Sequence, residues 1–345
     1  MKIIVTTKSF GEGFTDFDGF LPFLPQIMEQ TISMLALLER PEIIIDKLFA
    51  VHITDDYRKE LFDFQESIGQ AKFYTHNKIG EGKGQVITVE DGFHIFFDKQ
   101  VIVPIIAAQI FENNQLQIDN KIKASLAIEK NKYLRMVRHE LAHVEDLTNQ
   151  QKWNWAMGFG VSNNIKDNLQ YIALRLWEEY YACQRSNFMN NIEMLEDELS
   201  SLLANLTVAE EEICKQRWKY NIREISLEDF LKTLFEYIKM AFVYCCYFMG
   251  HYNKHSDTLE PFFVQGSYLS RFYSFIPSMW ECLKIMHESY PNWNTMEIFN
   301  GLSDILLCSI RSFEVYPEDT IEGTYYSIPP KELITRKQEY LKKQK

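Results

Sequence analysis

The sequence has 345 residues, of which 46 % are hydrophobic and 14 % aromatic, and its formal net charge is −12. This composition excludes a disordered chain, and the length allows one extended domain or two smaller ones. The acidic balance argues against nucleic acid or an anionic membrane as a partner, because both attract a basic protein surface.

Three further features predict a cytoplasmic protein. The N-terminal MKIIVTTKSFGEGF has too short an apolar run for a signal peptide. The most apolar later stretch, residues 240–250, is about half as long as a membrane-spanning helix must be. The six cysteines contain no CxxC pair, so they are interpreted as reduced thiols.

Strand signals are concentrated in the first hundred residues or so. Short β-branched or aromatic runs cover residues 2–7, 48–54, 71–76, 85–89 and 93–97. The last two runs flank Glu90-Asp91-Gly92, where Asp-Gly favours a tight hairpin turn. Helical patterns at 25–38 and 56–67 lie between the strands.

Beyond Phe97 the pattern is helical to nearly the end of the chain. The expected helices cover residues 101–112, 130–149, 163–206, 207–222, 226–250, 266–288, 294–313 and 330–344. The predicted fold class is α+β, with a small N-terminal sheet followed by a large, mostly helical region. A division into 1–155 and 156–345 follows from this change of pattern, although both parts could form one continuous catalytic domain.

The helix expected over 130–149 contains RHELAHVED, residues 138–146, and within it a His-Glu-x-x-His motif. At 100° per residue, His143 lies about 40° from His139, and Asp146 and Gln150 fall on the same face. An apolar stripe occupies the opposite side of the helix: Leu134, Val137, Leu141, Val144 and Thr148. The helix can therefore pack against a core while it presents both histidines on its other face.

Histidines four residues apart on a helix can converge on one zinc ion. Glu140 flanks them, where it can reach a metal-bound water without binding the metal itself. Asp146 could support a ligand imidazole through a hydrogen bond, or could be an exposed carboxylate. The alternative is that the three motif residues stand at this spacing by coincidence, and a third ligand is needed to decide.

One known continuation of the motif places Gly and His three and six residues after the second histidine. Those positions hold Asp146 and Asn149, so that class is excluded. The other large class takes its third ligand from a glutamate on a later helix. The search for the third ligand therefore moves to the segment that begins near residue 165.

That segment carries an apolar stripe whose members are Ile165, Leu169, Ile172 and Leu176. Glu179 and Cys183 occupy the next two places on the stripe. A carboxylate on a buried stripe needs a cation, and zinc is one candidate for Glu179. Arg175, one turn earlier on the same helix, is the other candidate cation for Glu179. Glu178 is the reserve candidate for the third ligand.

The motif and the later Trp177-Glu-Glu-Tyr-Tyr-Ala-Cys183 together resemble a gluzincin-type zinc metallopeptidase. In several such families the glutamate helix carries Glu-x-x-Ala followed by an acidic residue. Cys183 stands at that last position, so the support that the acidic residue normally provides is either missing or comes from elsewhere. The resemblance covers about residues 130–185 and implies a zincin-like fold.

Two histidines and one glutamate leave the fourth zinc position open to water, as in catalytic sites. Glu140 would then act as general base. Candidates for stabilising the oxyanion, by residue type alone, are Tyr180, Tyr181, His251 and His255. The resemblance also implies an edge strand that pairs with extended substrate, a role for His94–Phe97 or its partner strand. An interior strand is the alternative.

The sequence therefore predicts a cytoplasmic zinc-dependent peptidase that acts on a peptide or protein substrate. The first alternative is a non-proteolytic zincin-like protein that regulates or binds a partner. The second is a helical interaction protein without a metal. No motif specifies the substrate or the oligomeric state.

Overall fold

The computed structural model describes residues 1–9, 15–37, 41–73, 82–90, 92–106, 108, 120–153, 164–187, 192–252 and 270–329. The chain forms two compact units. The first consists of Met1–Lys152, Tyr181–Leu195 and Gly250–Lys254; the second consists of Trp153–Tyr180, Glu196–Met249 and His255–Lys345. The division of the sequence near residue 155 stays a prediction about independently folding domains.

The first unit contains a four-stranded sheet with the order β1-β2-β4-β3. Its strands are β1 (Lys2–Val5), β2 (Leu48–Thr54), β3 (Gly84–Val89) and β4 (Gly92–Asp98). β1, β2 and β4 are parallel, whereas β3 runs antiparallel to β4. β4 is therefore an interior strand, and β3 lies at an edge of the sheet that the described residues form.

The predicted hairpin between β3 and β4 is confirmed. Val89 pairs with Gly92 at its closed end. Gly92 has a φ of +137°, and a Cβ there would lie 2.6 Å from the carbonyl oxygen of Lys47. Glycine is therefore needed at this turn for its backbone conformation and for space.

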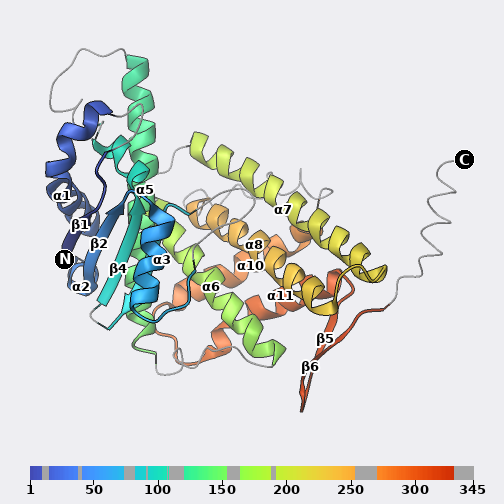
Figure 1. The fold of residues 1–345 in the computed structure, drawn as a ribbon. Helices are drawn as coiled ribbons and strands as arrows, with labels where there is room; N and C mark the ends of the chain where they lie inside the picture. The colour runs from blue at the N-terminus through green and yellow to red at the C-terminus, as the bar shows by residue number, and fades with distance from the viewer. Residues whose placement is uncertain are drawn as a thin grey trace, which may run out of the picture. The chain divides into compact units, whose positions relative to one another are not determined.

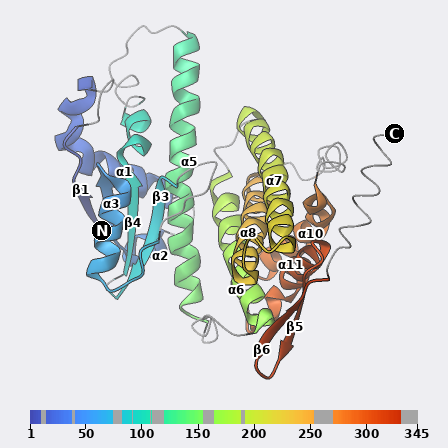
Figure 2. The same cartoon turned by 45° about the vertical axis from the view of Figure 1, so that its right-hand side comes forward.

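Helices cover both faces of this sheet (Figure 1, Figure 2). α1 (Leu24–Ala36), α2 (Pro41–Lys47) and α5 (Asn120–Gln150) share one core with β2 and β4, whose members include Ile32, Val51, Ile95, Val137 and Leu141. α3 (Tyr57–Ser67) packs on the opposite face in a smaller cluster formed by Tyr57, Leu61, Ile87 and Phe96. Two 3₁₀ segments also belong to this unit, η1 (Thr15–Phe23) and η2 (Lys99–Val101).

Most of the remaining elements belong to the second unit. Its helices are α6 (Ile165–Ser186), α7 (Ile192–Asn221), α8 (Leu227–Tyr252), η6 (Arg271–Phe275), α10 (Ile276–Ser289), η7 (Met296–Phe299) and α11 (Asn300–Ser312). The last residues of α6, the first of α7 and the last of α8 count with the first unit. β5 (Tyr316–Thr320) and β6 (Gly323–Ser327) form a separate antiparallel hairpin that extends beyond the helices (Figure 1).

Aromatic side chains fill much of the second unit. Trp177 lies 4.7 Å from Trp293 and 5.1 Å from Tyr290, measured between ring centroids. The indole of Trp153 donates a hydrogen bond to the carbonyl oxygen of Pro291 at 3.0 Å. The aromatic content of the C-terminal half therefore serves to a large extent as core.

Several predicted elements differ from the structure. The helix expected over 163–206 ends at Ser186, whose hydroxyl donates to the carbonyl oxygens of Ala182 and Cys183, and α7 starts at Ile192. Residues 71–73 are irregular rather than a strand, and 74–76 lie outside the described residues. The hairpin β5–β6 was not expected, because Pro317 and its acidic neighbours weaken the strand pattern.

Other predicted helices begin or end elsewhere. α5 begins ten residues before its expected start at 130. Of the helix expected over 101–112, residues 103–106 and 108 are helical, and most of the remainder lies outside the described residues, as do 330–344. Within the described ranges, none of the helices combines the length and apolar character that a bilayer crossing requires.

Candidate metal centre

Most side chains of the motif helix α5 are buried between Leu134 and Asn149. Its predicted apolar stripe is confirmed, since Leu134, Val137, Leu141 and Val144 all belong to the core beneath the sheet. A charged pair on another side of the helix is buried as well: Arg138 is fully buried, and its guanidinium lies 3.7 Å from the carboxylate of Glu145. Charges taken out of water must be paired, so this pairing is part of the structure of the helix.

The two motif histidines face each other on α5. Their Nε2 atoms are 3.0 Å apart, and the rings are nearly perpendicular, with centroids 4.7 Å apart. Both side chains are only half-buried. Two imidazole nitrogens at this distance must share a proton or face a common cation, because their lone pairs would otherwise repel each other.

Glu179 joins this pair from α6. His139, His143 and Glu179 each offer one ligand atom, and these three atoms all lie within 4.8 Å of one another. Glu178 has a different partner, since Arg175 donates to its carboxylate at 2.6 Å. The cluster therefore contains the glutamate that the apolar stripe had indicated, and the reserve candidate forms an ordinary ion pair.

The donor set fits zinc. Two imidazole nitrogens and one carboxylate oxygen are among the preferred zinc ligands, and catalytic sites use three protein donors. Zinc–nitrogen bonds of about 2.0–2.1 Å that meet at a tetrahedral angle place the nitrogens about 3.3 Å apart. The observed 3.0 Å differs by only a few tenths of an ångström, so a small movement of the rings would accommodate the ion.

Glu140 lies against the edge strand of the sheet. A Cβ placed on Gly84 at the start of β3 would lie 2.8 Å from Oε1 of Glu140 and 2.9 Å from its Cγ. The Glu140 side chain is nearly buried, with 7 % of its surface exposed. The absence of a side chain at Gly84 therefore makes room for this carboxylate next to the strand.

Cys183 contacts the motif as well. Its Sγ lies 3.6 Å from Nδ1 of His139, the ring nitrogen that does not face His143. The side chain is buried, with 1 % exposed. The position that departs from the resembled pattern is thus in contact with a candidate ligand.

A buried polar network links the end of α6 to α5. Arg185 donates to Glu145 at 3.1 Å, and the hydroxyl of Tyr181 also hydrogen-bonds to Glu145. Burial, together with the nearby Glu145, raises the pKa of Tyr181. Asp146 is fully buried, not exposed, and accepts a hydrogen bond from Gln150 at 2.8 Å.

The other candidates for oxyanion stabilisation lie in varied surroundings. Tyr180 is fully buried, its ring packs against Trp177 and Trp280, and burial raises its pKa. Nε2 of His251 lies 3.4 Å from the hydroxyl of Ser186. His255 lies outside the described residues. Tyr181 is thus hydrogen-bonded to Glu145, and the ring of Tyr180 is packed among aromatic side chains of the core.

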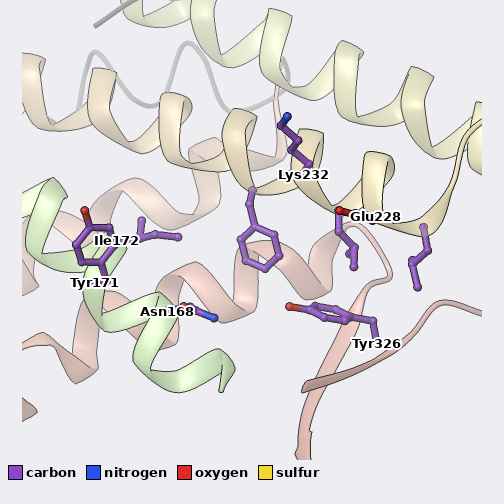
Figure 3. A pocket seen from close by; sticks show the side chains of 9 residues that line it. Asn168, Tyr171, Ile172, Glu228, Lys232 and Tyr326 are labelled. Atoms are coloured by element: carbon purple, nitrogen blue, oxygen red, sulfur yellow. The ribbon is translucent and has the colours of Figure 1, made fainter. Parts of the chain in front are cut away.

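The second unit also has a pocket of about 760 Å³ (Figure 3). It lies along α6, the first turns of α8 and the hairpin β5–β6, and its lining side chains are Asn168, Tyr171, Ile172, Leu227, Glu228, Leu231, Lys232, Phe235 and Tyr326. None of the candidate ligands, nor Glu140, is among these residues. The hydrolytic chemistry predicted from the motif therefore does not belong to this pocket.

Comparisons with known proteins add no relative. No family model matches the chain, and neither curated proteins nor solved structures gave a match. The chemistry of the site is therefore the basis for the function proposed below.

The sequence prediction missed two features of the site. Gly84 precedes the predicted strand 85–89, and a glycine just before a strand near the motif could have indicated a close approach. The contact between Cys183 and His139 could have been suspected from the stripe on α6, since Glu179 and Cys183 are one turn apart.

Proposed function

We propose that this protein is a zinc-dependent peptidase of the gluzincin type with a zincin-like catalytic core. His139, His143 and Glu179 would hold the ion, and Glu140 would be the general base. The observation that carries the proposal is the convergence of three ligand atoms within 4.8 Å of one another, from two separate helices. Coincidental spacing in the sequence does not account for a third donor at this place.

The residues divide the chemistry between them. Bound zinc supplies Lewis acidity, which polarises a substrate carbonyl and lowers the pKa of a water molecule. Glu140 accepts the proton of the attacking water and returns it to the leaving nitrogen. Its carboxylate lies beside Gly84 at the start of β3, and alignment of a base with the attacking water improves proton transfer.

An extended peptide is the substrate class that fits the edge of the sheet. Of the two hairpin strands, β4 is interior, so His94–Phe97 is excluded from pairing with substrate. β3 has a strand neighbour on one side only among the described residues. A peptide that adds to its free side would be held by backbone hydrogen bonds beside Gly84 and Glu140.

We also place the activity in the cytoplasm. All six cysteines lie within the described residues and none of them forms a disulfide, as is usual in a reducing compartment. The proposed partner is a peptide or protein substrate, and the net charge of −12 supports no role for nucleic acid or an anionic membrane surface.

The substitution Glu140→Gln tests the proposal. We expect the variant to bind one equivalent of zinc, as the wild type does, and to lose at least about a hundredfold in kcat/KM, the scale of a missing general base. Zinc would be measured by elemental analysis of protein purified without a histidine tag. Hydrolysis would be measured on a fluorescence-quenched peptide library of random sequence, with product termini identified by mass spectrometry.

Two other outcomes would reject the proposal in different ways. A wild type that binds zinc but shows no hydrolysis sensitive to Glu140→Gln would favour a non-proteolytic zincin-like protein. Less than about a tenth of an equivalent of zinc would instead favour a helical interaction protein without a metal, because catalytic zinc sites bind tightly.

A further inference from the structure

Cys183 and Glu179 lie on the same face of α6, because they are four residues apart on a continuous helix. Glu179 contributes a ligand atom to the three-residue cluster. Cys183 is directed to the same histidine pair, but its Sγ approaches Nδ1 of His139 at 3.6 Å. One face of α6 thus provides an oxygen for the metal cluster and a sulfur behind one of the ligand rings.

A ligand imidazole needs an acceptor for its second nitrogen. When one nitrogen binds a metal through its lone pair, the other carries the proton, and the hydrogen bond from that N–H sets the tautomer and the orientation of the ring. Nε2 of His139 faces Nε2 of His143 at 3.0 Å, so Nδ1 is the nitrogen left to donate. The buried Cys183 sulfur lies at that nitrogen.

We propose that Cys183 is the positioning residue of His139: its sulfur accepts the Nδ1–H hydrogen bond and thereby holds Nε2 toward the metal. This proposal rests on the proposed zinc site. In the resembled families an acidic residue stands at this position, and here a thiol makes the contact. Sulfur is a weak acceptor, so a carboxylate at the same place should serve at least equally well.

The first experiment measures zinc affinity by competition with a chromophoric chelator at pH 7.5. We expect Cys183→Ala to weaken zinc binding about 10- to 100-fold, as loss of a hydrogen-bond partner of a ligand histidine commonly does. Cys183→Asp should restore the affinity to within about threefold of the wild type or improve it, because a carboxylate accepts the same N–H more strongly. A restored zinc affinity in Cys183→Asp would show that the residue acts by accepting a hydrogen bond from His139 and not by filling space in the core.

The matched control is Cys245→Ala. Cys245 is also buried, with 1 % exposed, and lies on α8. This substitution removes the same buried thiol volume, so it should lower stability and leave the zinc affinity unchanged. An equal loss of affinity in both alanine variants would overturn the positioning role, as would a Cys183→Ala variant that binds zinc as tightly as the wild type.

A measurement on the unaltered protein covers the case in which Cys183→Ala fails to fold. Long-range nitrogen–proton correlation spectra of histidine-labelled, zinc-loaded wild type should show His139 protonated at Nδ1 and metal-bound at Nε2. Metal bound at Nδ1 would overturn the proposal. A wild type that binds no zinc would refute the proposed function itself, whereas an unaffected Cys183→Ala variant would refute only the role of Cys183.

Discussion

Gly84 is the residue at which the edge strand meets the proposed general base. A methyl group there would stand 2.8 Å from Oε1 of Glu140. The atoms it would meet belong to a flexible side chain, so the carboxylate can move aside at small cost. The consequence of adding a Cβ should therefore appear in activity rather than in stability.

We expect Gly84→Ala to lower kcat/KM at least about tenfold, because a displaced base loses alignment with the attacking water. Zinc content should be unchanged, and the free energy of unfolding should fall by no more than about 1 kcal/mol. Gly19→Ala is the control, since nothing lies within 4 Å of a Cβ at that glycine. Equal activity of both variants would contradict the role of Gly84.

His52 and His94 form a second histidine pair, away from the motif, on β2 and β4. Nε2 of His52 lies 3.0 Å from Nδ1 of His94, and the His52 ring stacks on Phe96 with centroids 4.1 Å apart. Burial, together with the neighbouring His94, lowers the pKa of His52 to about 4. The folded protein therefore favours neutral His52.

This pKa predicts an acid-sensitive stability. The unfolded chain takes up a proton at His52 near pH 6.5, whereas the folded chain does so only near pH 4. The stabilising contribution of neutral His52 to the free energy of unfolding is therefore complete above pH 6.5 and is lost as the pH falls toward 4. Because His52 is partly exposed, we expect the loss to be about 1–2 kcal/mol. Urea unfolding of wild type and His52→Phe at several pH values checks this, and identical pH dependence of the two proteins would contradict it.

At the scale of elements, one buried carboxylate connects the last turns of α6 to α5. Glu145 on α5 accepts from Arg185 and Tyr181 on the last turns of α6 and lies near Arg138 on its own helix. Tyr181 and Arg185 follow Glu179 by two and six residues on the same helix. The network therefore constrains the end of the helix that carries Glu179, the proposed third ligand.

We expect Arg185→Met to lower the free energy of unfolding by about 2 kcal/mol, because Glu145 loses one of its two arginine partners while it stays buried. Zinc affinity should fall as well, since the end of α6 is less constrained. The control is Lys215→Met, which removes an exposed pair with Glu212 and should cost under about 0.5 kcal/mol. Comparable losses in both variants, measured by urea unfolding, would contradict the special role of Glu145.

The elements that could be predicted from the sequence are those with strong local patterns. The β3–β4 hairpin, the apolar stripe of α5 and the general course of α8 follow from alternation or helical periodicity and are confirmed. The break between α6 and α7 was missed because apolar residues continue on both sides of it. The hydroxyl of Ser186 donates a hydrogen bond to a backbone carbonyl of its own helix, and such a bond does not alter the hydrophobic periodicity of the sequence.

For the molecule as a whole, bound zinc would connect α5 to α6 and would stabilise the folded chain, as a ligand that prefers the folded state does. Zinc at a hundred times its Kd should raise the free energy of unfolding by about 2.7 kcal/mol, because it binds the folded chain in preference to the unfolded one. Urea unfolding with zinc and with a chelator measures this difference. His143→Ala should abolish it, and a wild type that is equally stable in both conditions would contradict a site shared by the two helices.

By itself the sequence indicated the class of chemistry that we propose. His139, Glu140 and His143 stand at a spacing that brings two candidate ligands and a candidate base together on one helix, and this depends only on helix geometry. The stripe on α6 likewise selected Glu179 from two adjacent glutamates, because helical periodicity separates neighbours by 100°. These are local relations, and local periodicity suffices to predict them.

Only the tertiary structure decided how the parts meet. It brought Glu179 to the histidines, placed Gly84 against Glu140, made β3 rather than β4 the edge strand and set Cys183 behind His139. These contacts join residues about 40 to 60 positions apart in the chain. The packing of helices against the sheet and against each other creates them, whereas local patterns in the sequence indicate only which residues are candidates for such contacts.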